Sequence, residues 1–145
     1  MKSLEVLMVE DNPGDVILVQ EAMRKAGLTH RVRVVKDGVE ALEYLRRQGS
    51  YTAATRPDLI ILDLKLPRKS GREVLDEIQP DPFLHDIPLV VFSSSQSELA
   101  SARSHKFRAK SYIVKPSTFE GYVEFVQLIE KYRQAGLKEE TPEPS

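Results

Sequence analysis

The chain has 145 residues, of which 41% are hydrophobic and 30% are charged, and its formal net charge is −1. This length suits a single soluble domain, and a near-neutral charge without a long Lys/Arg run argues against nucleic-acid binding. Cysteine is absent, which excludes disulfides and thiolate metal sites, and no apolar run reaches membrane-spanning length. We therefore expect a cytoplasmic protein that contacts neither membrane nor nucleic acid.

Apolar runs alternate along the chain with segments of helical periodicity, which is typical of a parallel sheet covered by helices. Five strands are expected, at about residues 5–9, 31–35, 59–62, 89–92 and 111–114. A helix is expected after each strand, at about residues 13–26, 39–48, 72–79, 97–106 and 119–135. The sequence therefore predicts an α/β fold with one doubly wound, parallel, five-stranded sheet.

Capping and turn residues mark the boundaries of several expected elements. Asn12 is suited to cap the first helix, Pro13 to occupy its first position and Gly27 to end it. Asp37-Gly38 is expected to form a turn before the second helix. These local signals agree with the boundaries that the hydrophobic periodicity predicts.

Four of the expected strands end in residues suited to phosphoryl chemistry. The first strand is followed by Glu10-Asp11, the third by Asp63, the fourth by Ser93 and the fifth by Lys115. Because the carboxyl ends of parallel strands meet at one edge of a sheet, these side chains are expected to converge there. Each residue alone has a simpler interpretation, as a helix cap, a turn residue or part of a loop. Their joint placement favours a functional site.

Three carboxylates held close together repel one another unless a cation or a raised pKa relieves the charge. Oxygen ligands of this kind favour Mg²⁺ or Mn²⁺. The Asp63 carboxylate beside such an ion could attack phosphorus and form an acyl phosphate. Lys115 would supply a second positive charge, and Ser93 would donate a hydrogen bond to the phosphoryl group. The sequence thus predicts a Mg²⁺-dependent phosphoryl acceptor.

The chain resembles the receiver domain of two-component response regulators over about residues 4–133. The matching motifs are Glu10-Asp11, Asp63, Ser93 and Lys115-Pro116. The resemblance implies a flavodoxin-like (βα)₅ fold with sheet order 2-1-3-4-5. It also implies that a histidine kinase donates the phosphoryl group. The chain would then be no enzyme beyond Mg²⁺-dependent self-phosphorylation and autodephosphorylation.

The resemblance implies a set of metal ligands. Asp63 would be the phosphorylated residue and a ligand, Asp11 would bind Mg²⁺ directly, and Glu10 would bind it through water. The backbone carbonyl of Lys65 would complete the protein ligands. The side chain of Lys65 replaces an asparagine that is frequent in the most similar receivers, so its ammonium would face either the mouth of the site or the solvent.

The resemblance also implies a switch. Lys115 would pair with the acceptor and the phosphate, with a cis peptide bond before Pro116. Ser93 and Tyr112 would be the hydroxyl and aromatic residues that respond to phosphorylation. Arg108 stands where receivers commonly carry glycine, so the turn before the last strand departs from the family's pattern.

Residues 10–15 and 63–75 are similar, more narrowly, to cyanobacterial phytochrome response regulators. That group comprises single-domain receivers that are phosphorylated by a light-sensing histidine kinase and that form homodimers. The resemblance therefore implies a phytochrome-type kinase as the partner of this chain.

The output is expected to be a contact with a downstream protein. Residues 1–136 are expected to form the receiver domain, and the acidic, disordered segment 137–145 is too short for a helix-turn-helix. The apolar arc of the last helix spans about 220°, which is wider than a core stripe requires. The residues left for a second face are Phe119, Val123, Leu128 and Tyr132. They either cover neighbouring loops or form a homodimer interface with the fourth helix and the fifth strand.

Two other functions are compatible with parts of the sequence. A receiver-like module could dock partners without phosphorylation, although the acidic pair, Asp63 and Lys115 are all retained. A Mg²⁺-dependent phosphatase with an aspartyl nucleophile would carry Asp-x-Asp, rather than Glu10-Asp11, after the first strand. The three histidines are scattered and are expected at the surface; they are His30, His85 and His105.

Overall fold

Five parallel strands form one sheet in the order β2-β1-β3-β4-β5, as the resemblance to receiver domains implies. The computed structural model describes residues 3–105 and 109–137, so the expectations for Arg108 and for residues 138–145 lie outside the described residues. The strands are β1 (Glu5–Val9), β2 (Arg31–Val35), β3 (Leu59–Leu62), β4 (Leu89–Ser93) and β5 (Ser111–Val114). Every residue of β3 and β4 is buried, because helices cover both faces of the sheet.

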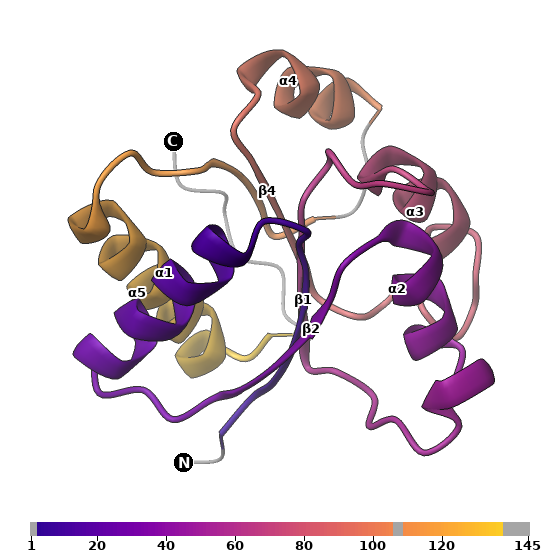
Figure 1. Ribbon diagram of the computed structural model, residues 1–145, viewed down its shortest axis with the longest axis horizontal. Coiled ribbons are helices and arrows are strands. Elements are labelled where there is room, and N and C mark those ends of the chain that lie inside the picture. Colours follow the sequence, from indigo (N-terminus) through magenta and orange to yellow (C-terminus); the bar gives the residue numbers. More distant parts are fainter. Residues whose placement is uncertain (1–2, 106–108, 138–145) are drawn as a thin grey trace.

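Helices cover both faces of the sheet. They are α1 (Pro13–Lys25), α2 (Gly38–Leu45), α3 (Gly71–Ile78), α4 (Gln96–Ser104) and α5 (Phe119–Ala135), with a short 3₁₀ turn, η1 (Gly49–Tyr51), after α2. In Figure 1, α1 and α5 lie together on one side of the sheet, and α2 and α3 lie on the other. One core cluster joins the sheet to α1 and α5, and a second joins it to α2, α3 and α4. This arrangement confirms the predicted flavodoxin-like fold. In the described part of the chain, no helix is both long and apolar enough to cross a membrane.

The register of the strands brings their carboxyl ends level. β1 and β3 are paired up to their last residues, and the N–H of Asp63 donates to the carbonyl of Val9 at 3.1 Å. β4 and β5 are also paired up to their last residues, and the N–H of Lys115 donates to the carbonyl of Ser93 at 2.9 Å. The residues that follow these strands therefore start from one edge of the sheet.

Side chains cap the first turns of the helices. The Asn12 side chain accepts hydrogen bonds from two N–H groups in the first turn of α1, which confirms the predicted cap. The chain turns at Asp37 before α2, as predicted, and Asp37 also caps this helix by accepting a hydrogen bond from the N–H of Glu40 at 2.8 Å. Gly38 is the first residue of α2, and a Cβ atom there would lie 2.1 Å from the carbonyl oxygen of Lys69. The glycine thus allows a close approach between segments.

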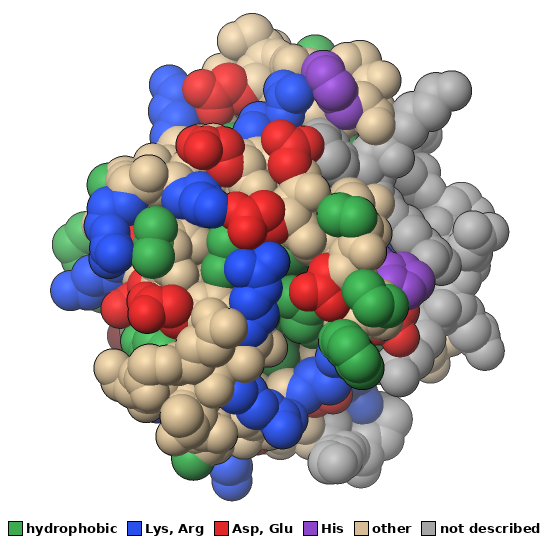
Figure 2. All heavy atoms as spheres, turned by 90° about the vertical axis from the view of Figure 1, so that its right-hand side faces the viewer, with side chains coloured by type: hydrophobic (Ala, Val, Ile, Leu, Met, Phe, Trp, Pro, Cys, Tyr) green, Lys and Arg blue, Asp and Glu red, His purple; other side chains and the backbone are tan. Residues whose placement is uncertain are grey.

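The face formed by α2 and α3 carries interspersed acidic and basic side chains (Figure 2). Arg46 and Lys69 both pair with Glu77 in α3, and Arg68 pairs with Asp37 at 3.2 Å. Because these pairs are partly exposed to water, each contributes little to the free energy of unfolding.

Candidate functional site

Three carboxylates converge at the carboxyl edge of the sheet, where the sequence predicts them. One oxygen of each of Glu10, Asp11 and Asp63 lies within 4.8 Å of the others. Glu10 follows β1 and Asp63 follows β3, and both side chains are buried, whereas Asp11 is exposed. Two buried carboxylates and one accessible carboxylate thus share a small volume.

The ammonium of Lys115, which follows β5, lies among these carboxylates. Its Nζ is 3.1 Å from Oδ2 of Asp63 and 2.8 Å from Oε1 of Glu10. A further carboxylate is as close, because Oδ2 of Asp15 lies 2.7 Å from Nζ. The side chain of Lys115 is only 10% exposed, so water screens these interactions weakly.

Asp15 belongs to the site although sequence reasoning alone does not find it. It lies in the first turn of α1, and its Oδ1 accepts a hydrogen bond at 3.2 Å from the hydroxyl of Tyr122 in α5. An acidic residue in the first turn of a helix is ordinarily explained by the helix dipole. Its sequence signals are its closeness to Glu10-Asp11 and its place in the motif of residues 10–15, and neither separates a site residue from one that stabilises the helix.

Burial and mutual repulsion change the protonation of the site. Burial, together with the nearby Asp63 carboxylate, raises the pKa of Glu10 to about 7, and the ammonium of Lys115 opposes this rise. Burial disfavours the charged form of Lys115, but the carboxylates of Asp15 and Glu10 outweigh it and raise the pKa of Lys115 above its ordinary value. Lys115 is therefore charged at neutral pH, whereas Glu10 takes up a proton near neutrality.

The residues present fit a divalent metal ion with oxygen ligands. Oε1 of Glu10 is buried and accepts no hydrogen bond, although Nζ of Lys115 lies at ion-pair distance. The other oxygen, Oε2, accepts a hydrogen bond from the N–H of Asn12 at 3.2 Å. A hard cation such as Mg²⁺ or Mn²⁺ would coordinate these carboxylate oxygens and offset the excess of negative charge. Glu10, Asp11 and Asp63 are the residues that could hold it.

Backbone contacts fix the position of Asp63. Its Oδ1 accepts a hydrogen bond from the N–H of Lys65 at 3.2 Å. α3 begins at Gly71, where a Cβ atom would lie 2.2 Å from the carbonyl oxygen of Asp63, so the close packing requires glycine. The side chain of Lys65 is exposed, and the role of its backbone carbonyl as a metal ligand stays a prediction.

The two predicted switch residues lie in neighbouring strands beside the site. Ser93 ends β4 and is fully buried, and its Oγ accepts a hydrogen bond from the N–H of Ser95 at 3.2 Å. Tyr112 in β5 is half-buried, and the guanidinium carbon of Arg103 in α4 lies 5.0 Å from its ring centroid. Their role as a switch stays a prediction. A cis peptide bond was expected before Pro116, but this bond is trans, as are all peptide bonds in the described residues. The trans isomer is the intrinsically favoured one.

The candidate dimer face is only partly exposed. Phe119 is 41% exposed, and Val123 and Leu128 are half-buried against the core cluster of α1 and α5. Tyr132 does not belong to an exposed face, because it is buried and its hydroxyl forms a 2.7 Å hydrogen bond with Oγ of Ser111. This corrects the expectation for Tyr132: the helical periodicity leaves it outside the core stripe, but its hydroxyl finds a buried partner in β5.

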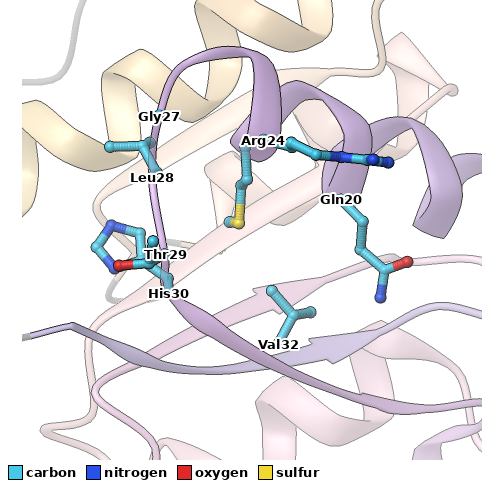
Figure 3. A pocket seen from close by; sticks show the side chains of 8 residues that line it. Gln20, Arg24, Gly27, Leu28, Thr29, His30 and Val32 are labelled. Carbon is cyan, nitrogen blue, oxygen red and sulfur yellow. The ribbon is translucent and has the colours of Figure 1, made fainter.

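A groove of about 330 Å³ lies at the opposite edge of the sheet, between the end of α1 and the start of β2 (Figure 3). Gln20 from α1 and Val32 from β2 line it on either side. His30, which also lines it, is buried rather than at the surface as predicted. Its Nδ1 accepts from the N–H of Leu4 at 3.0 Å, and its Nε2 lies 3.1 Å from Oε1 of Glu130. These contacts give His30 a structural role, so the carboxylate cluster is the better candidate site.

The fold and the carboxylate cluster have counterparts in a known family. The family model for the response regulator receiver domain matches residues 6–127 of the chain. The chain belongs to this family. Receivers of this family serve two-component signalling, which agrees with the resemblance seen in the sequence motifs.

Individual members of the family show to which kind of response regulator the chain is similar in sequence and structure. Response regulator Rcp1 of Synechocystis sp. is 39% identical to this receiver over 127 residues, which cover 88% of this chain and 86% of that protein. The crystal structure of the phosphorylated cyanobacterial phytochrome response regulator RcpA has a TM-score of 0.82 and 41% identity, covering 99% of this chain and 100% of that chain. The Mn²⁺-bound form of Rcp1 has a TM-score of 0.79 and 36% identity, over 98% of this chain and 99% of that chain. The receiver is therefore similar over most of its length to single-domain cyanobacterial phytochrome response regulators.

Proposed function

We propose that this receiver is a single-domain response regulator that accepts a phosphoryl group on Asp63 from a histidine kinase and signals through protein contacts. The observation that carries the proposal is the cluster of Glu10, Asp11 and Asp63 within 4.8 Å, with Nζ of Lys115 3.1 Å from Asp63. This cluster combines a nucleophile, a set of metal ligands and a fixed cation. Phosphoryl transfer to a carboxylate requires these three components.

In the proposed reaction a carboxylate oxygen of Asp63 attacks the phosphorus of the donor. The new O–P bond forms as the P–N bond of the kinase's phosphohistidine breaks, and the electron pair of that bond returns to the imidazole nitrogen. Lys115 offsets negative charge on the phosphoryl oxygens, and Ser93 donates a hydrogen bond to them. Mg²⁺ or Mn²⁺, when bound by Glu10, Asp11 and Asp63, supplies further positive charge to these oxygens.

The proposed kinase is a phytochrome-type light sensor. The similarity to RcpA supports this assignment, because RcpA is a phytochrome response regulator whose structure is of the phosphorylated form. The similarity to Mn²⁺-bound Rcp1 supports the proposed metal. The proposed setting is the cytoplasm, with a homodimer formed through α4, β5 and α5. Phosphorylation would reach this surface through Ser93 and Tyr112 and change its contact with a downstream protein.

The test is the intact mass of the purified protein after treatment with acetyl phosphate, with and without Mg²⁺. The wild-type protein should gain one phosphoryl group only in the presence of Mg²⁺, and Asp63→Asn should gain none. Asp76→Asn is the matched control, because it neutralises an exposed carboxylate in α3 and should be phosphorylated like the wild type. If the wild type binds Mg²⁺ but forms no adduct, the proposal is contradicted. The alternative, a receiver-like module that docks partners without phosphorylation, is then favoured.

A further inference from the structure

Asp15 joins the carboxylate cluster to α5 through two contacts. Its Oδ2 accepts a hydrogen bond from Nζ of Lys115 at 2.7 Å, and its Oδ1 accepts one from the hydroxyl of Tyr122 at 3.2 Å. Both side chains of the ion pair are shielded from water, with 17% of Asp15 and 10% of Lys115 exposed. The contact between Nζ and Asp63 is longer, at 3.1 Å. Oε1 of Glu10 lies 2.8 Å from the same Nζ, so Lys115 is shared among the phosphoacceptor, Glu10 and Asp15, and Asp15 is the one of the three that also contacts α5.

We propose that Asp15 is a positioning residue for Lys115, and that Tyr122 senses through Asp15 whether Lys115 is engaged by a phosphoryl group. This inference rests on the proposed phosphorylation of Asp63 and adds a second route from the site, toward α5. The ammonium of Lys115 has three N–H donors. A phosphoryl group carries more negative charge than the carboxylate oxygen that it replaces, so it competes with Asp15 for these donors. When Lys115 turns toward the phosphoryl oxygens, the hydrogen bond between Asp15 and Tyr122 changes with it.

The surroundings of Asp15 and Tyr122 favour transmission of this change. The N–H of Asp15 donates to the side chain of Asn12 at 3.3 Å, which fixes its backbone in the first turn of α1. The Tyr122 ring is buried and packs edge-on against Phe92, with ring centroids 6.0 Å apart. Burial and the Asp15 carboxylate raise the pKa of Tyr122 to about 12, so the hydroxyl is protonated at neutral pH and acts as a donor. The Lys115–Asp15–Tyr122 chain therefore links the end of β5 to α5 by two hydrogen bonds.

The variant Asp15→Asn removes the negative charge of the side chain and keeps its size and shape. An amide oxygen could still accept a hydrogen bond from Tyr122, but it would lack the charge that draws Lys115 away from Asp63. Tyr122→Phe has the complementary effect, because it removes the hydroxyl and retains the ring in the core. Tyr132→Phe is the matched control: Tyr132 is also buried in α5, but its hydroxyl bonds Ser111 rather than a residue of the site.

The first measurement is ¹⁹F NMR of the full chain labelled with 3-fluorotyrosine, which reports on all five tyrosines. The resonances of Tyr122 and Tyr132 are assigned from their loss in the two Phe variants. On addition of acetyl phosphate and Mg²⁺, the Tyr122 resonance should shift in proportion to the phosphoryl adduct seen by intact mass, and the Tyr132 resonance should stay in place. In Asp15→Asn, the shift of Tyr122 should be largely lost at the same extent of phosphorylation.

The second measurement is the dependence of the phosphorylation rate on Mg²⁺ concentration. Lys115 already pairs with Glu10 and Asp63, the carboxylates that the metal needs, and without the charge of Asp15 these two hold its ammonium alone. Asp15→Asn should therefore raise the Mg²⁺ concentration for half-maximal rate by about tenfold. Glu21→Gln removes the same charge from an exposed position of α1 and should leave this concentration unchanged.

The outcomes separate this inference from the proposed function. A Tyr122 resonance that does not move in a protein that carries the phosphoryl adduct overturns the inference and leaves the proposed function intact. An equal shift in Asp15→Asn, or an unchanged Mg²⁺ requirement, also overturns the inference alone. A wild-type protein that forms no adduct overturns both.

Discussion

Lys115 is one ammonium among several carboxylates, and this imbalance decides how the site is charged. Glu10 is almost completely buried, and one of its oxygens accepts no hydrogen bond. Burial and the Asp63 carboxylate raise its pKa to about 7. At the scale of residues, the proton on Glu10 and a divalent cation are therefore alternative ways to relieve the same repulsion.

The Mg²⁺ affinity should consequently decrease below about pH 7. A raised pKa means that Glu10 holds a proton below this pH, and the metal must displace it, so the affinity should fall by up to about tenfold per pH unit. Isothermal titration calorimetry across this pH range measures the effect, and Glu10→Gln should flatten the profile. A wild-type affinity profile as flat as that of the variant would contradict the raised pKa of Glu10.

The raised pKa of Glu10 also affects the stability of the metal-free protein. Its contribution to the free energy of unfolding is complete below pH 4.5 and is lost as the pH rises through 7.

At the scale of elements, the junctions between strands and helices determine where the site residues stand. The apolar runs predict β3 correctly, but they do not show that α3 starts directly against the backbone of Asp63. Gly71 lies at this junction, and its N–H donates to the carbonyl of Leu64 at 3.0 Å. The added Cβ would overlap backbone atoms of Asp63 and Leu64, which cannot move aside as a flexible side chain could.

Gly71→Ala should therefore lower the free energy of unfolding by about 1 to 3 kcal/mol, because overpacking forces a shift of the backbone. It should also slow phosphorylation of Asp63, since the shift falls on that residue. Urea unfolding at neutral pH measures the first effect. Gly14→Ala is the matched control, because its added methyl in the first turn of α1 would meet only the side-chain oxygen of Asn12, at 3.1 Å. Equal stability of the two variants would refute the packing argument.

Four large apolar side chains among the described residues are exposed, and they lie in separate parts of the chain; one of them is Ile17 in α1. Val114 at the end of β5 and Phe119 at the start of α5 are 40% and 41% exposed. Phe83, in the segment after α3, is 77% exposed and lies outside the proposed α4–β5–α5 interface. An interface through β5 and α5 would bury Val114 and Phe119 and leave Phe83 in solvent.

Phe119→Lys should weaken the proposed homodimer at least about tenfold, because an apolar contact is replaced by a charge. Sedimentation velocity over a range of protein concentrations measures the dissociation constant. Phe83→Lys introduces the same charge at a more exposed phenylalanine and should leave the dissociation constant unchanged. A wild-type protein that stays monomeric with and without phosphorylation would exclude the dimer.

The order of strands and helices along the chain was predictable from the sequence, because apolar runs and helical periodicity are local properties of the chain. It was also predictable that residues following β1, β3, β4 and β5 would gather at one edge, since parallel strands share a direction. For this reason the structure places Glu10, Asp11 and Asp63 together as predicted. The cap of α1 at Asn12 was predictable on the same local grounds.

The contacts that α5 makes with distant side chains could not be predicted from the sequence. Asp15 and Tyr122 are separated by 107 positions in the chain, and no local pattern records their hydrogen bond. The burial of His30 against Glu130, 100 positions away, and the contact between Tyr132 and Ser111 depend equally on how α5 packs on the sheet. A polar side chain is buried where its hydrogen-bond partner lies, and that partner is set by packing rather than by its own neighbours in sequence.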